Sequence, residues 1–399
     1  MSHSISMNKP SSMTMNTLSD VYLNQAAVFL PNPPVSNEQM EQVLGMVGDV
    51  PSRVRRMILR SNGIQSRHYA MDAETRAATH SCTELAALAV EALFQQGVDK
   101  AAIGCLSCGT SYPDQLMPGH GVMVHGLLQQ APPYEVASLA GVCVAGMAAM
   151  KYAFNAIKTG EHRHAIACAA ESASAIMRKE AFQAEMDHKQ WADAKPEIAF
   201  EKDFLRWMLS DGAGAVYLSH APNPFQATLK IHWIDLISYA NEMPPCMYAG
   251  AEINEGVWTS WKAAPDGHQR SLMSIKQDVK LLNEHIIHYT VEKALQQVLH
   301  KHPLRAEDID YFLPHYSSHF FRDRVYQALK QMDFELPYHK WFTNLPSKGN
   351  TGSASIYIML EEFIRTTDLQ TGQKILCYVP ESGRFSSSFM LLEVVNGQA

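Results

Sequence analysis

The sequence lacks the features that would place it in a membrane, in a secretory route or on nucleic acid. No apolar run approaches the roughly 20 residues of a membrane-spanning helix. Residues 1–19 lack the basic start and apolar stretch of a signal peptide, so we expect a flexible tail there. The 40 acidic and 33 basic residues leave a formal net charge of −7. Since nucleic-acid binders are usually strongly basic, we expect a soluble protein that binds neither membranes nor nucleic acid.

Paired cysteines and metal-ligand sets are also missing. The chain has 7 cysteines, an odd number, and most lie in apolar stretches, which is typical of reduced thiols in the cytoplasm. Cys105 and Cys108 have ligand spacing, but no second Cys or His pair follows at such spacing, so we expect no metal. One local cluster of basic residues fits either an acidic or phosphate-bearing partner or a solvated helix face. It consists of Arg53, Arg55, Arg56, Arg60 and Arg67.

The hydrophobic pattern predicts an α/β protein, because short apolar runs alternate with longer segments of helical periodicity. The expected strands are residues 101–107, 164–170, 213–218, 311–314 and 374–379. The expected helices are residues 74–96, 144–158, 278–301, 320–332 and 355–366.

An internal repeat of strand, glycine-rich turn, helix and strand divides the chain into two similar halves. Cys143 lies 40 residues after Ile103 in the first strand of its half, and Asn350 lies 38 residues after Phe312 in the corresponding strand. The next strand of each half ends in Ala-Glu-Ser or Pro-Glu-Ser. If the halves pack about a pseudo-twofold axis, Cys143 and Asn350 both begin a helix that faces the junction.

This repeat predicts the domain organisation. We expect an N-terminal half over residues 20–220 with the cysteine and a C-terminal half over residues 221–399 with the asparagine. Residues 222–283, rich in Trp, Met, Pro and Tyr, fit the repeat least well. We interpret them as the connection between the halves and an insertion that lines a substrate site.

Cys143 is the candidate nucleophile. It stands between Gly141 and Gly146, in a turn of small residues before an Ala- and Met-rich helix. A helix N-terminus favours the thiolate and offers backbone N–H groups to an oxyanion. The alternative is a buried structural cysteine, although such a residue would not need glycines for close backbone approach.

Two further residues could complete an active site around this cysteine. His315 stands where an apolar strand ends, as a base or polarising group would, with His319 and His120 as competitors. Asn350 lies between Gly349 and Gly352 immediately before a helix. An ordinary helix N-cap explains an asparagine there, but two glycines in four residues indicate closer packing than a cap requires.

Together these segments resemble the thiolase-like condensing enzymes, and within them β-ketoacyl-acyl-carrier-protein synthase III. The resemblance covers nearly the whole chain and rests on the order of several loose motifs. They are NQAAVFLPNPPVSNEQM near the start, RSNGIQSRHYA, the Cys143 segment, LSDGAGAVYLS, FLPHYSS and SKGNTGSAS. It implies a five-layer αβαβα fold, two pseudo-symmetric halves and a homodimer.

The resemblance also implies the chemistry. Cys143 corresponds to the acyl-accepting nucleophile, while His315 and Asn350 correspond to the pair that polarises the extender thioester carbonyl and stabilises the enolate left by decarboxylation. The backbone N–H groups of Cys143 and Gly383 would form the oxyanion hole. No cofactor is implied, because the acyl groups arrive as thioesters of acyl carrier protein or coenzyme A.

Departures from the family pattern point to a specialised branch. The nucleophile is followed by Val-Ala-Gly-Met instead of x-Gly-Phe, Met57 stands where coenzyme A-using members often have Trp, and Tyr316 to Ser318 replace the usual Gln-Ala-Asn. With the long chain, this is similar to branches of polyketide or fatty-acid-derived secondary metabolism that join two acyl chains into cyclohexanedione or resorcinol products. Glu171 could add an acid or base, with a structural role as its default.

Three alternatives stay open. A thiolase needs a second reactive cysteine near the C-terminus, whereas Cys377 stands inside an apolar strand. A cysteine acyl hydrolase of the α/β-hydrolase type expects an acidic residue between its nucleophile and its histidine and no Asn in a glycine turn after them. A non-catalytic supporting subunit of a heteromeric synthase would have no need for Cys143, His315 and Asn350 together.

Overall fold

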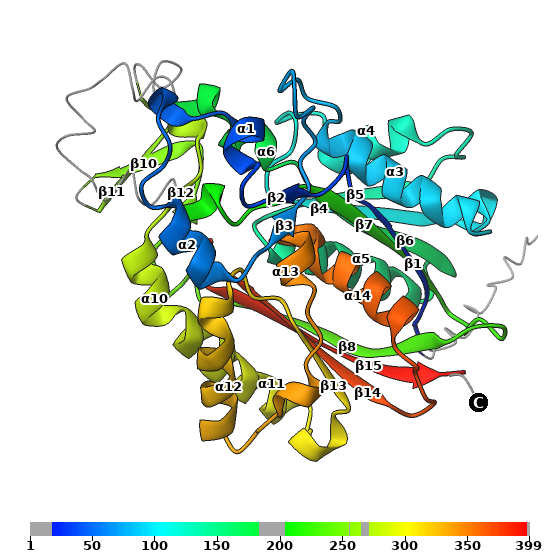
Figure 1. Cartoon of the computed structure of the whole chain (residues 1–399). Coiled ribbons are helices and arrows are strands. Elements are labelled where there is room, and N and C mark those ends of the chain that lie inside the picture. The colour runs from blue at the N-terminus through cyan, green and yellow to red at the C-terminus, as the bar shows by residue number, and fades with distance from the viewer. Residues whose placement is uncertain (1–17, 183–203, 255, 265–270, 397–399) are drawn as a thin grey trace, which may run out of the picture.

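A computed structural model of the chain describes residues 18–182, 204–254, 256–264 and 271–396. Helices and strands alternate in five layers (Figure 1). Helices α5 (Val144–Lys158) and α14 (Ser355–Thr366) form the central layer between two groups of strands. α3 (Cys82–Gln95) covers one group from outside, and α12 (Arg322–Gln331) lies outside the other. This architecture confirms the predicted α/β fold class.

The first half of the chain contributes the strand order β1-β7-β6-β4-β5. Strands β4, β5 and β6 are parallel, and β7 pairs antiparallel with β6 and β1. Parallel neighbours need crossover connections, which contain α4 and α5. The elements are β1 (Tyr22–Phe29), β4 (Cys105–Thr110), α4 (His120–Leu127), β5 (Glu135–Ala140), β6 (His164–Glu171) and β7 (Gly212–Ser219).

The second half repeats this plan with the order β13-β14-β15-β8. β13 and β14 are parallel, and β15 pairs antiparallel with β14 and β8. Where the first half has β5, the second has an isolated parallel bridge between Phe312 and Trp341. β1 and β8 join the two groups of strands through two register pairs. The strands are β8 (Thr228–Ser238), β13 (Tyr311–Pro314), β14 (Lys374–Glu381) and β15 (Ser386–Val395).

Two predicted helices differ in detail from the structure. α3 begins at Cys82 and not near residue 74, because Ser81 and Glu84 form a capping box that satisfies the first N–H groups. The helix expected over residues 278–301 consists of α10 (Val279–Ile287), a π-helical turn (His288–Lys293) and α11 (Ala294–Lys301).

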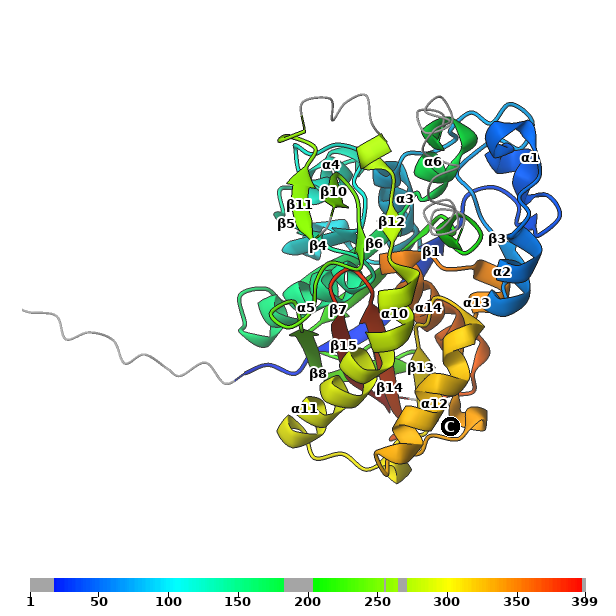
Figure 2. The same ribbon diagram turned by 90° about the vertical axis from the view of Figure 1, so that its left-hand side faces the viewer.

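Several shorter elements, among them α1, α6, β10, β11 and β12, lie in the upper part of Figure 2. Residues 222–283 contain the sheet strand β8 as well as short strands outside the sheet. The predicted tail, residues 1–19, lies almost entirely outside the described residues. The short elements are β2 (Val35–Ser36), α1 (Met40–Leu44), α2 (Arg55–Asn62), β3 (Ser66–Arg67), α6 (Ser174–Met177), β9 (Met247–Tyr248), β10 (Ala251–Asn254), β11 (Val257–Ser260), β12 (Lys276–Gln277) and α13 (Leu345–Lys348).

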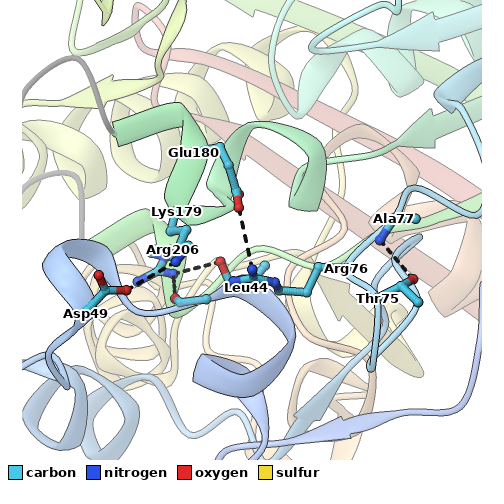
Figure 3. Close-up of polar contacts among 9 residues, drawn as sticks. Leu44, Asp49, Thr75, Arg76, Ala77, Lys179, Glu180 and Arg206 are labelled. Carbon is cyan, nitrogen blue, oxygen red and sulfur yellow. Dashed lines mark hydrogen bonds and ion pairs between the residues drawn. The ribbon is translucent and has the colours of Figure 1, made fainter.

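A buried arginine contacts the end of α1, and an ion pair links the 3₁₀ turn Val47–Asp49 to the segment after α6 (Figure 3). Lys179 Nζ lies 3.1 Å from an Asp49 carboxylate oxygen. Arg206 is buried and donates to the carbonyl oxygen of Leu44 at 3.2 Å. Arg67 is also buried, so it does not belong to the exposed basic cluster that the sequence suggested. None of the described helices has the length and hydropathy needed to cross a bilayer.

Candidate active site

The predicted site residues lie at the carboxyl ends of the parallel strands, where α/β sheets usually bind ligands. Cys143 follows β5 after a short turn, and His315 directly follows β13. Asn350 lies between α13 and the 3₁₀ turn Gly352–Ala354 that precedes α14. The two halves thus contribute residues to one place, Cys143 from the first half and His315 and Asn350 from the second.

Two cavities meet at Cys143. One is lined by Cys143, Asn350 and Glu171, and the other by Cys143 and His315. The first cavity is otherwise mostly apolar, and its walls include Phe204, Leu205, Met208, Leu209, Met247 and Ile275. The second runs between α10 and α12. The structure therefore brings Cys143, His315 and Asn350 together, as the sequence suggested.

The electrostatic environment of Cys143 differs from the sequence expectation. The residue is half-buried and forms the N-cap of α5, where the helix terminus was expected to favour the thiolate. Burial, followed by the nearby carboxyl groups of Glu381 and Glu171, instead raises the pKa of the Cys143 thiol. Both causes favour the thiol over the thiolate.

His315 is suited to donate a hydrogen bond as a neutral imidazole. Its side chain is buried, and burial lowers its pKa to about 4. Its backbone N–H donates to the carbonyl oxygen of Tyr378 at 2.8 Å, which holds the residue against the end of β14. A neutral imidazole has one N–H donor and one acceptor nitrogen.

Asn350 is fixed by its own turn. Its side-chain oxygen accepts the N–H of Gly352 at 2.9 Å, which leaves the amide NH₂ group as the donor. Gly349 has φ +70°, and a Cβ there would lie 2.9 Å from the Cβ atoms of Arg67 and Ser210. The glycine is required by conformation and space, so this segment packs more closely than an ordinary cap.

The predicted oxyanion-hole partner, Gly383, lies beside the nucleophile's turn. A Cβ added to Gly383 would approach Val142 Cγ2 to 2.8 Å. The carbonyl oxygen of Gly383 accepts the N–H of Cys246 at 2.8 Å. This bond orients the turn after β14, while the role of the Gly383 N–H stays a prediction.

Glu171 has the structural contacts of a buried anchor. One of its oxygens accepts the N–H and hydroxyl of Ser111, at 3.0 and 2.6 Å, and those of Ser353, at 3.1 and 2.5 Å. These bonds tie the ends of β4 and β6 to the turn after Asn350. Burial raises the pKa of its carboxyl group.

The competing residues lie elsewhere. Within the described residues, neither His120 nor His319 lines the two cavities, and the His319 ring packs against Gly63 at the end of α2. Cys377 is buried inside β14, which does not fit the second reactive cysteine of a thiolase. Cys105 and Cys108 are buried in β4.

Glu381 is the residue that sequence reasoning missed. It stands at the end of β14 and accepts the N–H of Val142 at 3.1 Å, next to the nucleophile. The signal was present, because its Pro-Glu-Ser step corresponds to the Ala-Glu-Ser step at Glu171 in the repeat. A possible metal-ligand group, Glu135 with Glu161 and His162, begins at the opposite end of β5 from Cys143.

Comparisons with known proteins bear on the family and the fold of the chain. The family model for the C-terminal part of 3-oxoacyl-[acyl-carrier-protein] synthase III matches residues 299–388. The β-ketoacyl-[acyl-carrier-protein] synthase III of Clostridium perfringens is 24% identical over 350 residues, which cover 88% of this chain and 92% of the relative.

Solved structures show the same fold. A tetronic acid condensing enzyme is 20% identical with a TM-score of 0.70, over 94% of this chain and 99% of that one. OleA of Xanthomonas campestris, solved with bound lauric acid and lauroyl-CoA, is 18% identical with a TM-score of 0.69 over 94% and 99% of the chains.

Proposed function

Because the chain is a β-ketoacyl-acyl-carrier-protein synthase III-like acyltransferase of the thiolase fold, we propose that it joins two acyl thioesters by a Claisen-type condensation through an acyl-Cys143 intermediate. One observation carries the proposal. Cys143 lines two cavities at once, with Asn350 in one and His315 in the other. Both cavities therefore reach the same nucleophile.

The first step is acyl transfer to the enzyme. The Cys143 sulfur attacks the thioester carbonyl, a new carbon–sulfur bond forms, and the carrier thiol leaves with the proton lost by Cys143. The N–H groups of Cys143 and Gly383 stabilise the oxyanion that forms on the carbonyl oxygen.

The second step forms the carbon–carbon bond. An extender thioester loses CO₂, and the electron pair of the broken bond becomes an enolate. His315 and Asn350 donate hydrogen bonds to the enolate oxygen, where negative charge develops. The enolate carbon attacks the acyl-Cys143 carbonyl, and the Cys143 sulfur leaves as a thiolate, which takes up a proton from solvent to restore the thiol.

The substrates in this proposal are long acyl chains of fatty-acid-derived or polyketide secondary metabolism. Apolar side chains dominate both cavities, including Phe204, Met208 and Ile275 in one and Ile286 and Val325 in the other. Bound lauroyl-CoA in OleA supports this substrate class. We further propose that the product closes to a cyclohexanedione or resorcinol precursor. Analysis of the reaction products tests this step.

The proposed carrier is acyl carrier protein or coenzyme A, with no further cofactor. Arg53, Arg56 and Arg60 are exposed on and before α2 and could bind the acidic surface of a carrier protein or a phosphate. Arg55 pairs with Glu41 at 2.8 Å.

We also propose a homodimer that works in the cytoplasm. Strand β5 is an edge strand of the sheet, and edge strands can pair with a second chain. Beside it, the exposed apolar side chains of α4 and the preceding loop favour burial against a partner. They are Leu116, Met117, Val122, Met123 and Leu127. The cysteines are free, as the cytoplasm allows.

Intact-mass spectrometry tests the proposal. The protein and a Cys143→Ala variant are incubated with lauroyl-CoA and with a panel of acyl-carrier-protein thioesters. A single acyl adduct that the variant lacks is the expected result. No adduct from any donor would reject the condensing activity and support a non-catalytic subunit.

A further inference from the structure

Two glutamates at equivalent places in the repeat hold the helices of each other's half. Glu171 ends β6 in the first half and accepts the N–H of Ser353 ahead of α14 in the second. Glu381 ends β14 in the second half and accepts the N–H of Val142 ahead of α5 in the first. The pseudo-twofold relation therefore places a carboxyl group at the start of each central helix.

Glu381 accepts hydrogen bonds from the backbone on both sides of the nucleophile. Its carboxylate accepts the N–H of Val142 at 3.1 Å and also a backbone bond from Val144. These are the residues on either side of Cys143. A Cβ at Gly383 would lie 3.0 Å from a Glu381 oxygen, so the small residue after β14 leaves space for the carboxylate.

From this arrangement we propose that Glu381 is a positioning residue for Cys143: it fixes the turn before α5, and its negative charge adds to the effect of burial in keeping the free sulfur in the thiol form. A carboxylate at a helix N-terminus stabilises the helix. The same charge opposes a second negative charge on the adjacent sulfur. Once Cys143 carries an acyl group, the sulfur is neutral and this opposition ends.

Two other titratable groups, Glu171 and His315, lie near the Cys143 sulfur. Glu171 faces it from the end of β6, with a smaller effect on the thiol than Glu381. His315 faces the second cavity from the end of β13 and is neutral at pH 7, because burial lowers its pKa to about 4. Glu381 is therefore the charged neighbour whose removal should change Cys143 most.

Alkylation by iodoacetamide tests the inference without an acyl substrate. The rate at the Cys143 peptide is measured by mass spectrometry from about pH 6 to pH 10, a range that brackets a free cysteine pKa of about 8.5. Wild type is compared with Glu381→Gln, which keeps a hydrogen-bond acceptor but loses the charge. Glu171→Gln is the matched control, because it makes the same change at the equivalent position of the other half.

Cys143 in Glu381→Gln should be alkylated roughly threefold faster than in wild type, or more, at pH 7.5. The midpoint of its rate–pH profile should lie at lower pH than in wild type. Glu171→Gln should change both quantities less. An unchanged or higher midpoint in Glu381→Gln, or a larger effect in Glu171→Gln, would overturn the inference. Wild type alone provides a check if the variant does not fold, because a midpoint below that of free cysteine would also overturn it. The result is independent of the proposed condensation, since iodoacetamide requires no acyl donor.

Discussion

Replacing Gly146 by alanine should uncouple the two halves of the active site. Gly146 lies in the first turn of α5, three residues after the nucleophile. A Cβ there would lie 2.1 Å from the carbonyl oxygen of Ser353 and 3.1 Å from the Tyr357 ring. The Tyr357 hydroxyl donates to the Gly146 carbonyl at 2.7 Å. This bond holds α14 against α5 at the place where the added Cβ would lie.

The added methyl group must separate α5 from the turn after Asn350 by about 1.3 Å to reach ordinary van der Waals distance. Overpacking of this kind costs about 1–3 kcal/mol of the free energy of unfolding. Because the shift moves Cys143 relative to Asn350, condensation should slow by roughly 100-fold, the usual effect of such a misplacement. Acyl transfer to Cys143 should slow less, since it does not use Asn350.

Denaturant unfolding and single-turnover measurements of acyl-Cys143 formation and decay test this prediction. Gly126→Ala is the matched control, because a Cβ at this exposed position of α4 meets nothing within 4 Å. That variant should gain about 0.5–1 kcal/mol from helix propensity. Equal stability and equal condensation rates in Gly146→Ala and wild type would refute the reasoning.

Three further predictions concern the site and the response to pH. His315→Ala and Asn350→Ala should still form the acyl adduct but condense about 100- to 1,000-fold more slowly in product assays, because each loses one donor to the enolate; loss of the adduct would contradict this role. Val325→Phe and Met208→Phe should each shorten the chain accepted in one cavity only, which substrate-length competition would show; identical effects would mean a single shared cavity. Burial lowers the pKa of both His315 and His120 to about 4, so the unfolded chain binds more protons between about pH 6.5 and pH 4. The free energy of unfolding should therefore fall through that window by up to about 3 kcal/mol per histidine, and His120→Asn should reduce the fall measured by denaturation at each pH.

The repeat in the sequence was enough to predict where the main residues lie. Equal spacing from strand to turn placed Cys143 and Asn350 at the starts of α5 and α14, and the end of an apolar run placed His315 after β13. These predictions depend on local pattern and on the rule that parallel strands end together. The start of α3 was wrong because the capping box at Ser81 outweighs apolar periodicity.

The electrostatics of the nucleophile could not be predicted in the same way. The helix start at Cys143 favours a thiolate when only neighbours in the sequence are considered. Burial of the thiol is the main cause that reverses this tendency and raises the pKa of Cys143, and the carboxyl group of Glu381, 239 positions away from its partner Val142, adds to it. Burial of the thiol likewise depends on the packing of both halves.

Glu171 and Glu381, each of which contacts the other half of the chain, connect the fold to the proposed chemistry. A repeat whose halves merely packed together could satisfy each helix start from its own half. Here Glu171 and Glu381 each reach across the junction, so a displacement of one half disturbs the turn before the nucleophile and the turn after Asn350 together. The positions of Cys143, Asn350 and the two carboxylates are therefore coupled, and a substitution that removes the hydrogen-bond acceptor of either glutamate should affect both steps of the condensation.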